Sequence, residues 1–487
     1  MCSQCGTLIV LPPTQLQAGK VMLENMTGLN ELIIQLAENI TEIEERKRRR
    51  TDSETERFIY SLNKILTDVW RGIHISPEHQ SHINKQNNAY FGDARYRDPN
   101  LTYRPTMAAF KGLQLLNLIR VTRKGYLDRE TLESSLTRYR PTPKLASMLE
   151  SLKGHPAICL LPDLNAETII LRNRVEGRKL QIAYDETTET TQLRNDLKKI
   201  NLILATHWAD LELSGEQFKA LQIRLMLDGE RQPIDFSRRT IVRIFSNGSF
   251  EEGGRFYRGW WENVPSEYRR YITLDSKRTY EYDYSQLNPH IIYAIQNKEL
   301  GSEDAYGRVL DGDHRDIVKQ AFNAMLQAKR DLTRCPAKLD ISELGMTWRE
   351  LKTAILKAHQ PIAHQFFTGI GNRLQYEDSC LAEDVMLSFA KIDAPALPVH
   401  DSFIMHHGYG SELEEKMRKA FFERYGRNIP VKKEFFEAVA KTEFEDLSVE
   451  SILADREQYK DWHARHDEWF EARNRITREL RRQNTVK

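Results

Sequence analysis

Two carboxylates that lie far apart in the chain occupy positions where two short strands are expected to end. The residues around Asp283 alternate in polarity, which predicts a strand with this carboxylate near its end. Two apolar runs within residues 396–405 flank His400 and Asp401, which predicts a tight hairpin with Asp401 at its tip. Two carboxylates on neighbouring strand ends can share a pair of divalent cations, an arrangement that serves phosphoryl transfer. Mg²⁺ is the expected ion, with Mn²⁺ as a substitute, because Mg²⁺ favours carboxylates and phosphate oxygens.

A helix expected between the two carboxylates carries a pair of cations. It begins near residues 311–313 and places Arg315 and Lys319 on one face, close to its positive end. The planar fork of Arg and the point charge of Lys suit a triphosphate, and Lys319 is a candidate proton donor to pyrophosphate. Phe322 and Asn323, one turn further on, are expected to contact a base or sugar. Such a cation pair alone is usually a solvated helix face, and it is the order of all three elements that favours a site.

That order resembles the family A DNA polymerases, the polymerase I-like enzymes. Residues 283–287 look like the first palm motif of the family, Arg315 with Lys319 like its fingers helix, and His400 with Asp401 like its second palm motif. The resemblance covers about 165 residues. It implies an α+β chain with a polymerase right-hand fold, in which an antiparallel palm sheet and compact helical fingers follow a mainly helical N-terminal part.

The resemblance also implies roles for single residues. Asp283 and Asp401 would bind both metal ions, and the backbone carbonyl of Tyr284 would complete the metal shell. Arg315 and Lys319 would hold the triphosphate of an incoming dNTP while a primer 3′-hydroxyl attacks the α-phosphate. The implied function is therefore template-directed nucleotidyl transfer by a DNA polymerase.

Further segments are similar to family segments that contact the primer-template duplex. These are the pair at 254–255, the segment at 263–265 and a glutamine in a helical stretch downstream. The resemblance implies nucleic-acid contacts, with DNA primer-template as the partner, at Arg255, Asn263, Gln375 and His400. His400 is expected to lie beside the hairpin rather than to act as a general base.

Two departures from the family pattern keep other functions open. Asn288 stands where the family has the Glu that excludes a 2′-hydroxyl, and a shorter neutral side chain leaves room for rNTPs and a nucleotide-binding role of its own. Ser402 replaces a third carboxylate, and residues 400–403 are similar to the phage-type single-subunit RNA polymerases. The alternatives are an RNA polymerase or primase-like enzyme, or a nucleic-acid-binding replication protein with an inactive palm.

Composition excludes several classes of protein. No apolar run in the 487 residues is long enough to span a bilayer, so no membrane partner is expected. Five scattered cysteines and the lack of a signal pattern predict a cytoplasmic protein. The net charge is only +1, yet residues 101–179 hold 14 Lys and Arg against 7 Asp and Glu. This segment and the basic tail are expected to contact phosphates.

Four regions are expected along the chain. They are an N-terminal helix and linker (1–56), a basic helical region that could be a winged helix or a thumb (57–200), palm and fingers (201–455), and a basic C-terminal helix (456–487). The winged-helix alternative rests on a helix over 106–119 that runs into a basic turn.

Three smaller features also give predictions. Apolar residues at heptad spacing over 22–43 predict a helix that packs on the body of the protein or forms a coiled coil. Cys2 and Cys5 form half of a zinc-like motif, which alone is weak. Trp260 and Trp261 are expected in the core, with base stacking as the alternative.

Overall fold

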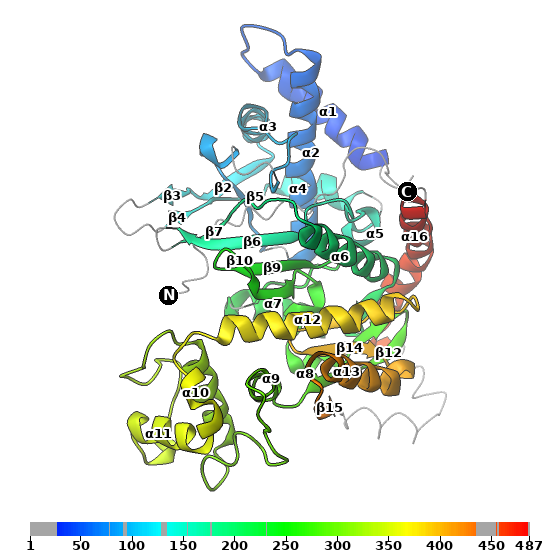
Figure 1. The fold of residues 1–487 in the computed structure, drawn as a ribbon. Helices are drawn as coiled ribbons and strands as arrows, with labels where there is room; N and C mark the ends of the chain where they lie inside the picture. Colours follow the sequence, from blue (N-terminus) through cyan, green and yellow to red (C-terminus); the bar gives the residue numbers. More distant parts are fainter. Residues whose placement is uncertain are drawn as a thin grey trace.

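The computed structural model describes residues 27–485, apart from 77, 91–94, 128–133, 153, 176–177, 230, 435–453 and 455–456. Helices and mostly antiparallel sheets alternate in this part of the chain, which confirms the α+β class. Helix α12 (Gly371–Ala390) crosses the middle of the molecule, with helices α1 to α3 on one side of it and α10 and α11 on the other (Figure 1). Cys2 and Cys5 lie outside the described residues.

A six-stranded antiparallel sheet carries the residues around Asp283 and Asp401. Its order is β13-β14-β12-β11-β8, and β15 pairs with β12 on the edge opposite to β14. The strands are β8 (Ala209–Leu211), β11 (Ile272–Leu274), β12 (Lys277–Tyr284), β13 (Leu397–Val399), β14 (Ser402–His406) and β15 (Val431–Glu434). Helix α13 (Gly410–Tyr425) packs against the sheet, and α9 (Leu287–Ile295) packs against α13 and α12.

A second sheet lies along α12. Strands β9 (Val242–Ser246) and β10 (Ser249–Tyr257) form a hairpin, β6 (Ile169–Val175) pairs with β9 in parallel, and β7 (Arg178–Gln181) completes the order β10-β9-β6-β7. Gly254 of β10 has φ +76, and a Cβ there would lie 2.8 Å from Oγ of Ser379 on α12. A side chain at this position would push strand and helix apart.

The N-terminal part contains more strand than its sequence suggests. Helices α1 (Thr27–Ile43), α2 (Asp52–Ile75), α3 (Tyr103–Leu115) and α4 (Pro143–Glu150) surround the sheet β1-β5-β2, with strands at Ser81–Ile83, Thr137–Pro141 and Ile119–Arg123. Helices make up most of the described N-terminal part, as expected, and the short strands β1 to β7, all before residue 200, are an addition that the sequence did not predict. Helix α3 ends before the predicted limit because Asn117 has φ 53 and the chain then enters β2.

Helix α1 uses its heptad stripe within the chain. Its buried residues contact α2 and α3, and they are Leu29, Leu32, Ile33, Leu36, Ala37 and Ile40. Gly112 of α3 permits this packing, because a Cβ there would lie 2.3 Å from Cγ2 of Ile40. Of the two alternatives for this helix, packing on the body of the protein is confirmed, while residues 22–26 lie outside the described part.

The C-terminal helix α16 (Lys460–Thr485) docks on α6 (Thr188–Thr206) through Trp469, Ile476 and other buried residues. Its cations serve this docking. Arg473 pairs with buried Asp210 at 3.2 Å, and Arg481 pairs with Asp393. In the free protein these two arginines are held by carboxylates, and contact of the tail with phosphates stays a prediction.

Throughout the described segments, each helix is too short or too polar to cross a bilayer.

Candidate active site

The predicted hairpin is present, and its tip is held by the core. Val399 and Ser402 are cross-strand partners, so His400 and Asp401 form a two-residue loop. His400 has φ 59, a conformation that His adopts more readily than most side chains. Trp261 is buried and donates from Nε1 to the carbonyl of Pro398 at 3.0 Å, which anchors the first strand of the hairpin. The core position predicted for Trp260 and Trp261 is confirmed.

Asp283 and Asp401 meet at the end of the β12–β14 ladder. Asp283 is the cross-strand partner of Ser402, and Asp401 directly precedes Ser402 in the chain. Burial, and next the negative charge of Asp401, raise the pKa of Asp283 to about 8, while the ammonium of Lys319 opposes the shift. Two carboxylates and a lysine from three distant segments thus share one electrostatic environment, in which burial and the neighbouring negative charge disfavour ionisation of Asp283.

The two carboxylates fit a divalent cation. Oδ1 of Asp283 is buried and has no hydrogen-bond partner among the described residues, which is costly for a carboxylate unless a cation or donor satisfies it. Within the described ranges, no group of three or more His, Cys, Asp or Glu is arranged to hold a metal. Mg²⁺ is held by one or two carboxylates together with water and substrate phosphates. The donor set here is of that kind.

The backbone at Tyr284 has a suitable direction for a further oxygen ligand. The N–H of Ser285 donates to the carbonyl of Pro430, on the β15 side of β12. Successive residues of an antiparallel strand present their polar groups to opposite neighbours. The carbonyl of Tyr284 therefore faces the β14 side, where Asp401 lies. The Tyr284 side chain is buried, and its hydroxyl donates to the carbonyl of Met417.

We expect divalent-ion affinity to rise with pH. Because the pKa of Asp283 is raised to about 8, this carboxyl holds a proton at neutral pH, and an incoming ion must displace it. Between pH 7 and pH 9 the apparent affinity for Mn²⁺ should increase about tenfold. Calorimetric titration of the protein with Mn²⁺ alone, without nucleotide or DNA, measures this change. An affinity that stays constant over this interval would contradict the assignment of Asp283 as a ligand.

Two further carboxylates surround the pair, and sequence reasoning missed both. Glu281 lies two residues before Asp283 and accepts from Nη1 of Arg269 at 2.6 Å and from Oγ of Ser402 at 2.5 Å. Ser402, at the position where the resemblance leads one to expect a carboxylate, thus fixes Glu281. Period-two alternation along β12 could have revealed Glu281, because it shares a face with Asp283.

Asp378 of α12 is the second of these carboxylates. It is buried and pairs with Arg255 at 2.7 Å. Burial raises its pKa to about 7, against the effect of Arg255 and with a further contribution from the charge of Asp401. No sequence motif indicates it, because α12 reaches the six-stranded sheet only through tertiary packing.

Two of the four predicted nucleic-acid contacts lie near the carboxylates. Arg255 pairs with Asp378, and the negative charge of Asp401 contributes to raising the pKa of Arg255. Burial, then the charge of Arg255, lower the pKa of His400, so this imidazole is neutral at pH 7. Asn263 accepts from the N–H of Gln232 at 3.1 Å, and Gln375 lies half-buried on α12. Among the described residues, neither of these two contacts Asp283 or Asp401.

Helix α10 (Arg315–Gln327) begins at the predicted place and presents its two cations differently. Nε of Arg315 pairs with Oδ2 of Asp304 at 3.0 Å, and the guanidinium lies 5.3 Å from the ring centre of Tyr306. Lys319 is exposed, acts electrostatically on Asp283, and makes no ion pair with a carboxylate of the described segments. Of the two cations, Lys319 is the one available to a ligand.

The prediction for Phe322 is wrong. Phe322 is fully buried and packs against the rings of Tyr306, His359 and Phe366, so it supports α10 and offers no surface to a nucleotide. Asn323 is half-buried, and its Oδ1 accepts from Nδ2 of Asn288 at 2.9 Å. Tyr306 hydrogen-bonds to Asn323.

Comparison with known proteins gives little further information. No family model and no curated protein matches the chain. A solved structure, the POL domain of Pol1 from M. smegmatis in complex with DNA primer-template and dNTP, matches with a TM-score of 0.29 and 13% sequence identity. The match covers 45% of this chain and 50% of that one, so this chain spans half the length of its neighbour. A likeness this low carries no argument about activity.

Proposed function

We propose that this protein is a template-directed nucleotidyltransferase that extends a DNA primer with dNTPs on a DNA template. One observation carries the proposal. Within the described ranges, the buried Oδ1 of Asp283 has no partner, lies at the same strand ends as Asp401, and is acted on from helix α10 by the ammonium of Lys319, which forms no ion pair there. Paired carboxylates opposite a free cation suit a reaction in which negative charge moves between phosphate oxygens.

Asp283 and Asp401 would hold Mg²⁺, with the carbonyl of Tyr284 as a further oxygen ligand. When bound, such ions activate the attacking hydroxyl and stabilise charge on the leaving phosphate. Asp378 and Glu281 do not compete for this role, because Arg255 neutralises the first and Arg269 with Ser402 occupies the second. The protein thus leaves two carboxylates free at the strand ends.

The chain's cations would manage the triphosphate. Lys319 can compensate the negative charge of the β- and γ-phosphates and donate its proton to the departing pyrophosphate, because no carboxylate of the described segments holds it. Arg315 would have to exchange Asp304 for a phosphate, and its guanidinium offers a planar fork for that purpose. Because this ion pair must first break, Arg315 is the weaker contributor in the free enzyme.

RNA synthesis is the second candidate, and the environment of Asn288 favours it. Asn288 is neutral, and its amide donates to Asn323 and leaves its own oxygen for a hydroxyl donor. A ribose 2′-hydroxyl can donate to such an oxygen. An enzyme with Asn at position 288 would accept rNTPs more readily than one with a carboxylate at this position.

A primer-extension assay tests the proposal. Labelled primer-template is incubated with Mg²⁺ or Mn²⁺ and with dNTPs or rNTPs in separate reactions. Metal-dependent extension with dNTPs supports a DNA polymerase. Equal or faster extension with rNTPs would favour RNA synthesis, and the absence of extension with either set would support an inactive palm.

Asn288→Glu is expected to increase discrimination against rNTPs by about tenfold or more. The added methylene and charge fill the space beside Asn323 and leave an unfavourable contact for a 2′-hydroxyl, and steric differences of this size are worth about 10- to 200-fold. The ratio of kcat/KM for dATP and ATP in the same preparation measures the change. An unchanged ratio would place the sugar away from residue 288.

A further inference from the structure

Residues 52–141 fold as a helix, a strand, a short helical segment, a second long helix and two antiparallel strands. In chain order these elements are α2, β1, η2 (Asn87–Tyr90), α3, β2 and β5, and the sheet order is β1-β5-β2. A second hairpin, β3 (Tyr126–Leu127) with β4 (Ser134–Ser135), extends the connection between β2 and β5. Figure 1 shows strands β3 and β4 near the outer edge of the molecule. The order of these elements and of the strands in the sheet is that of a winged helix. In this arrangement α3 is the second long helix, and strands β3 and β4 belong to the wing.

Helix α3 is divided into a buried and an exposed face. Thr106, Met107, Phe110 and Leu113 are buried, and α3 contacts α1 and α2. Arg104, Lys111 and Leu115 are exposed, and with half-buried Ala108 they follow the spacing four, three, four. Residues at this spacing form one stripe along a helix. Leu115 remains 70% exposed, so the stripe has no partner within the described chain.

Exposed cations of the described residues gather around this stripe. The exposed ones are Lys85, Arg104, Lys111, Arg120, Arg123 and Lys124. Burial, followed by the positive charges of Lys111 and Lys124, lowers the pKa of Lys85, as expected when three ammonium groups from different segments lie within reach of one another. None of the six pairs with a carboxylate of the described residues, whereas Arg140 of the same sheet pairs with Glu78 at 2.7 Å.

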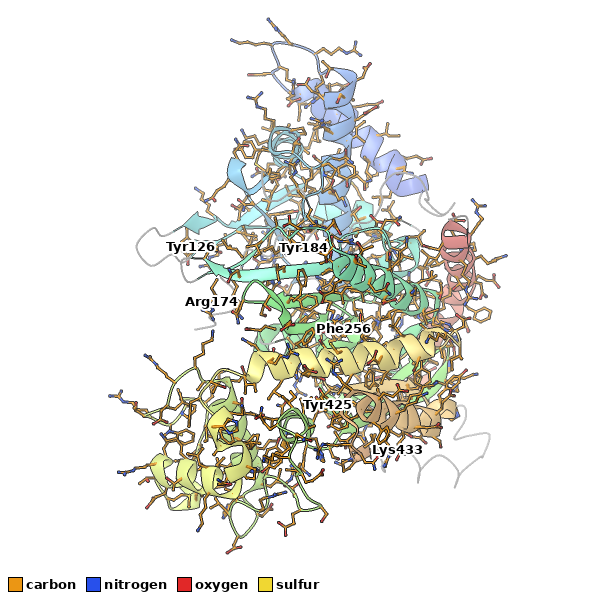
Figure 2. The ribbon with its side chains drawn as sticks, in the orientation of Figure 1. Tyr126, Arg174, Tyr184, Phe256, Tyr425 and Lys433 are labelled. Atoms are coloured by element: carbon orange, nitrogen blue, oxygen red, sulfur yellow. The ribbon has the colours of Figure 1, made fainter. Side chains whose placement is uncertain are left out.

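These cations lie on α3 and on the segments on either side of it, where they would flank α3 if this helix lay in a groove of duplex DNA. Lys85 follows β1, Lys111 lies on α3, and Lys124 lies between β2 and the wing. Tyr126, the first wing residue, is 45% exposed and lies at the outer edge of the molecule (Figure 2). An α-helix has a diameter of about 10–12 Å, and the major groove of B-DNA is about 12 Å wide.

We propose that the exposed face of α3 and the lysines beside it form a binding face for duplex DNA, with α3 in the major groove and Lys85 and Lys124 on the flanking phosphates. The face lies on the N-terminal sheet, whereas Asp283 and Asp401 lie on the β12–β14 ladder. Binding here requires no primer end, nucleotide or metal ion. The enzyme would therefore hold duplex DNA at a second place, and the inference stands or falls separately from nucleotidyl transfer.

The test uses full-length protein and a labelled duplex closed by hairpin loops at both ends, so that no primer terminus is present. Fluorescence anisotropy is measured over a series of salt concentrations, without divalent ions or nucleotides. Lys85→Ala/Lys111→Ala/Lys124→Ala should weaken binding at least tenfold and make the slope of log K against log salt shallower by up to about 3, since each phosphate that a lysine neutralises contributes about 0.9. The matched control Lys219→Ala/Lys338→Ala/Lys419→Ala removes three exposed lysines elsewhere and should leave both quantities unchanged.

Two outcomes would overturn the inference. One is a triple variant that binds with the affinity and salt slope of its control. The other is equal affinity for an RNA duplex of the same length, because the narrow major groove of A-form RNA does not admit a helix. Primer extension at saturating primer-template is a separate readout, and it should be the same for both triple variants. A loss of extension in Asp401→Asn with normal binding to the closed duplex would concern the active site alone.

Discussion

Replacing Asp401 with Asn should lower the rate of primer extension about a thousandfold or more while the protein still folds and binds primer-template. The substitution keeps the size of the side chain and removes its charge. Asp401 lies in a loop between strands that the core anchors, so the hairpin should persist. The rate falls because Asp283 alone cannot hold two cations, and charge stabilisation at such sites contributes several kcal/mol. Single-turnover extension with Mg²⁺, beside a binding titration, separates the two effects.

A second measurement distinguishes loss of the site from a general defect. The charge of Asp401 is, after burial, the next contribution to the raised pKa of Asp283. In Asp401→Asn the pKa of Asp283 should therefore fall, which carboxyl-resolved NMR can detect. Asp228→Asn, at the exposed end of α7 (Gly215–Asp228), is the matched control and should extend primers normally. More than a tenth of the normal rate in Asp401→Asn would contradict a catalytic role for this carboxylate.

Local patterns predicted the elements that carry the site. Alternation around Asp283, the two-residue break at His400 and Asp401, and the charged start of α10 are encoded in short stretches of sequence, and the structure has all three. The burial of Trp260 and Trp261 is equally local, because adjacent aromatic side chains are costly to expose.

The features that the sequence did not reveal depend on tertiary contacts. Strands β1 and β5 are short, and the TRYRP sequence of β5 alternates charged with buried residues so briefly that no period stands out. Asp378 faces the site because α12 packs along β10. The C-terminal arginines resemble a phosphate-binding tail in the sequence, and only the fold brings Asp210 and Asp393 to them as partners.

The prediction for Phe322 is wrong although its helix was predicted correctly from local sequence. The helix around it is where the sequence places it, but α10 turns Phe322 inward with Val318, Ala321 and Met325. Helical periodicity groups these residues on one face, as it does for most core stripes. The polar contacts of this region come instead from Asn323 and Asn288, with Tyr306 from the loop before the helix.

Lys319→Met should reduce the rate of primer extension by about a hundredfold, which is within the usual range for loss of a general acid or a charge-stabilising group. Methionine keeps an unbranched side chain of similar length and a high helix propensity, so α10 should be preserved. Arg315→Met should have a smaller effect, because Asp304 already holds that charge in the free enzyme.

Lys357→Met, on the exposed face of α11 (Trp348–Ala358), is the matched control for Lys319→Met and should leave the rate unchanged. Lys319 also opposes the raised pKa of Asp283, so its removal should raise that pKa further and weaken Mn²⁺ binding at pH 7. Weaker ion binding together with slower extension would place Lys319 at the reacting phosphates. A variant that behaves like Lys357→Met in both assays would remove α10 from the active site and leave the two carboxylates without their cationic partner.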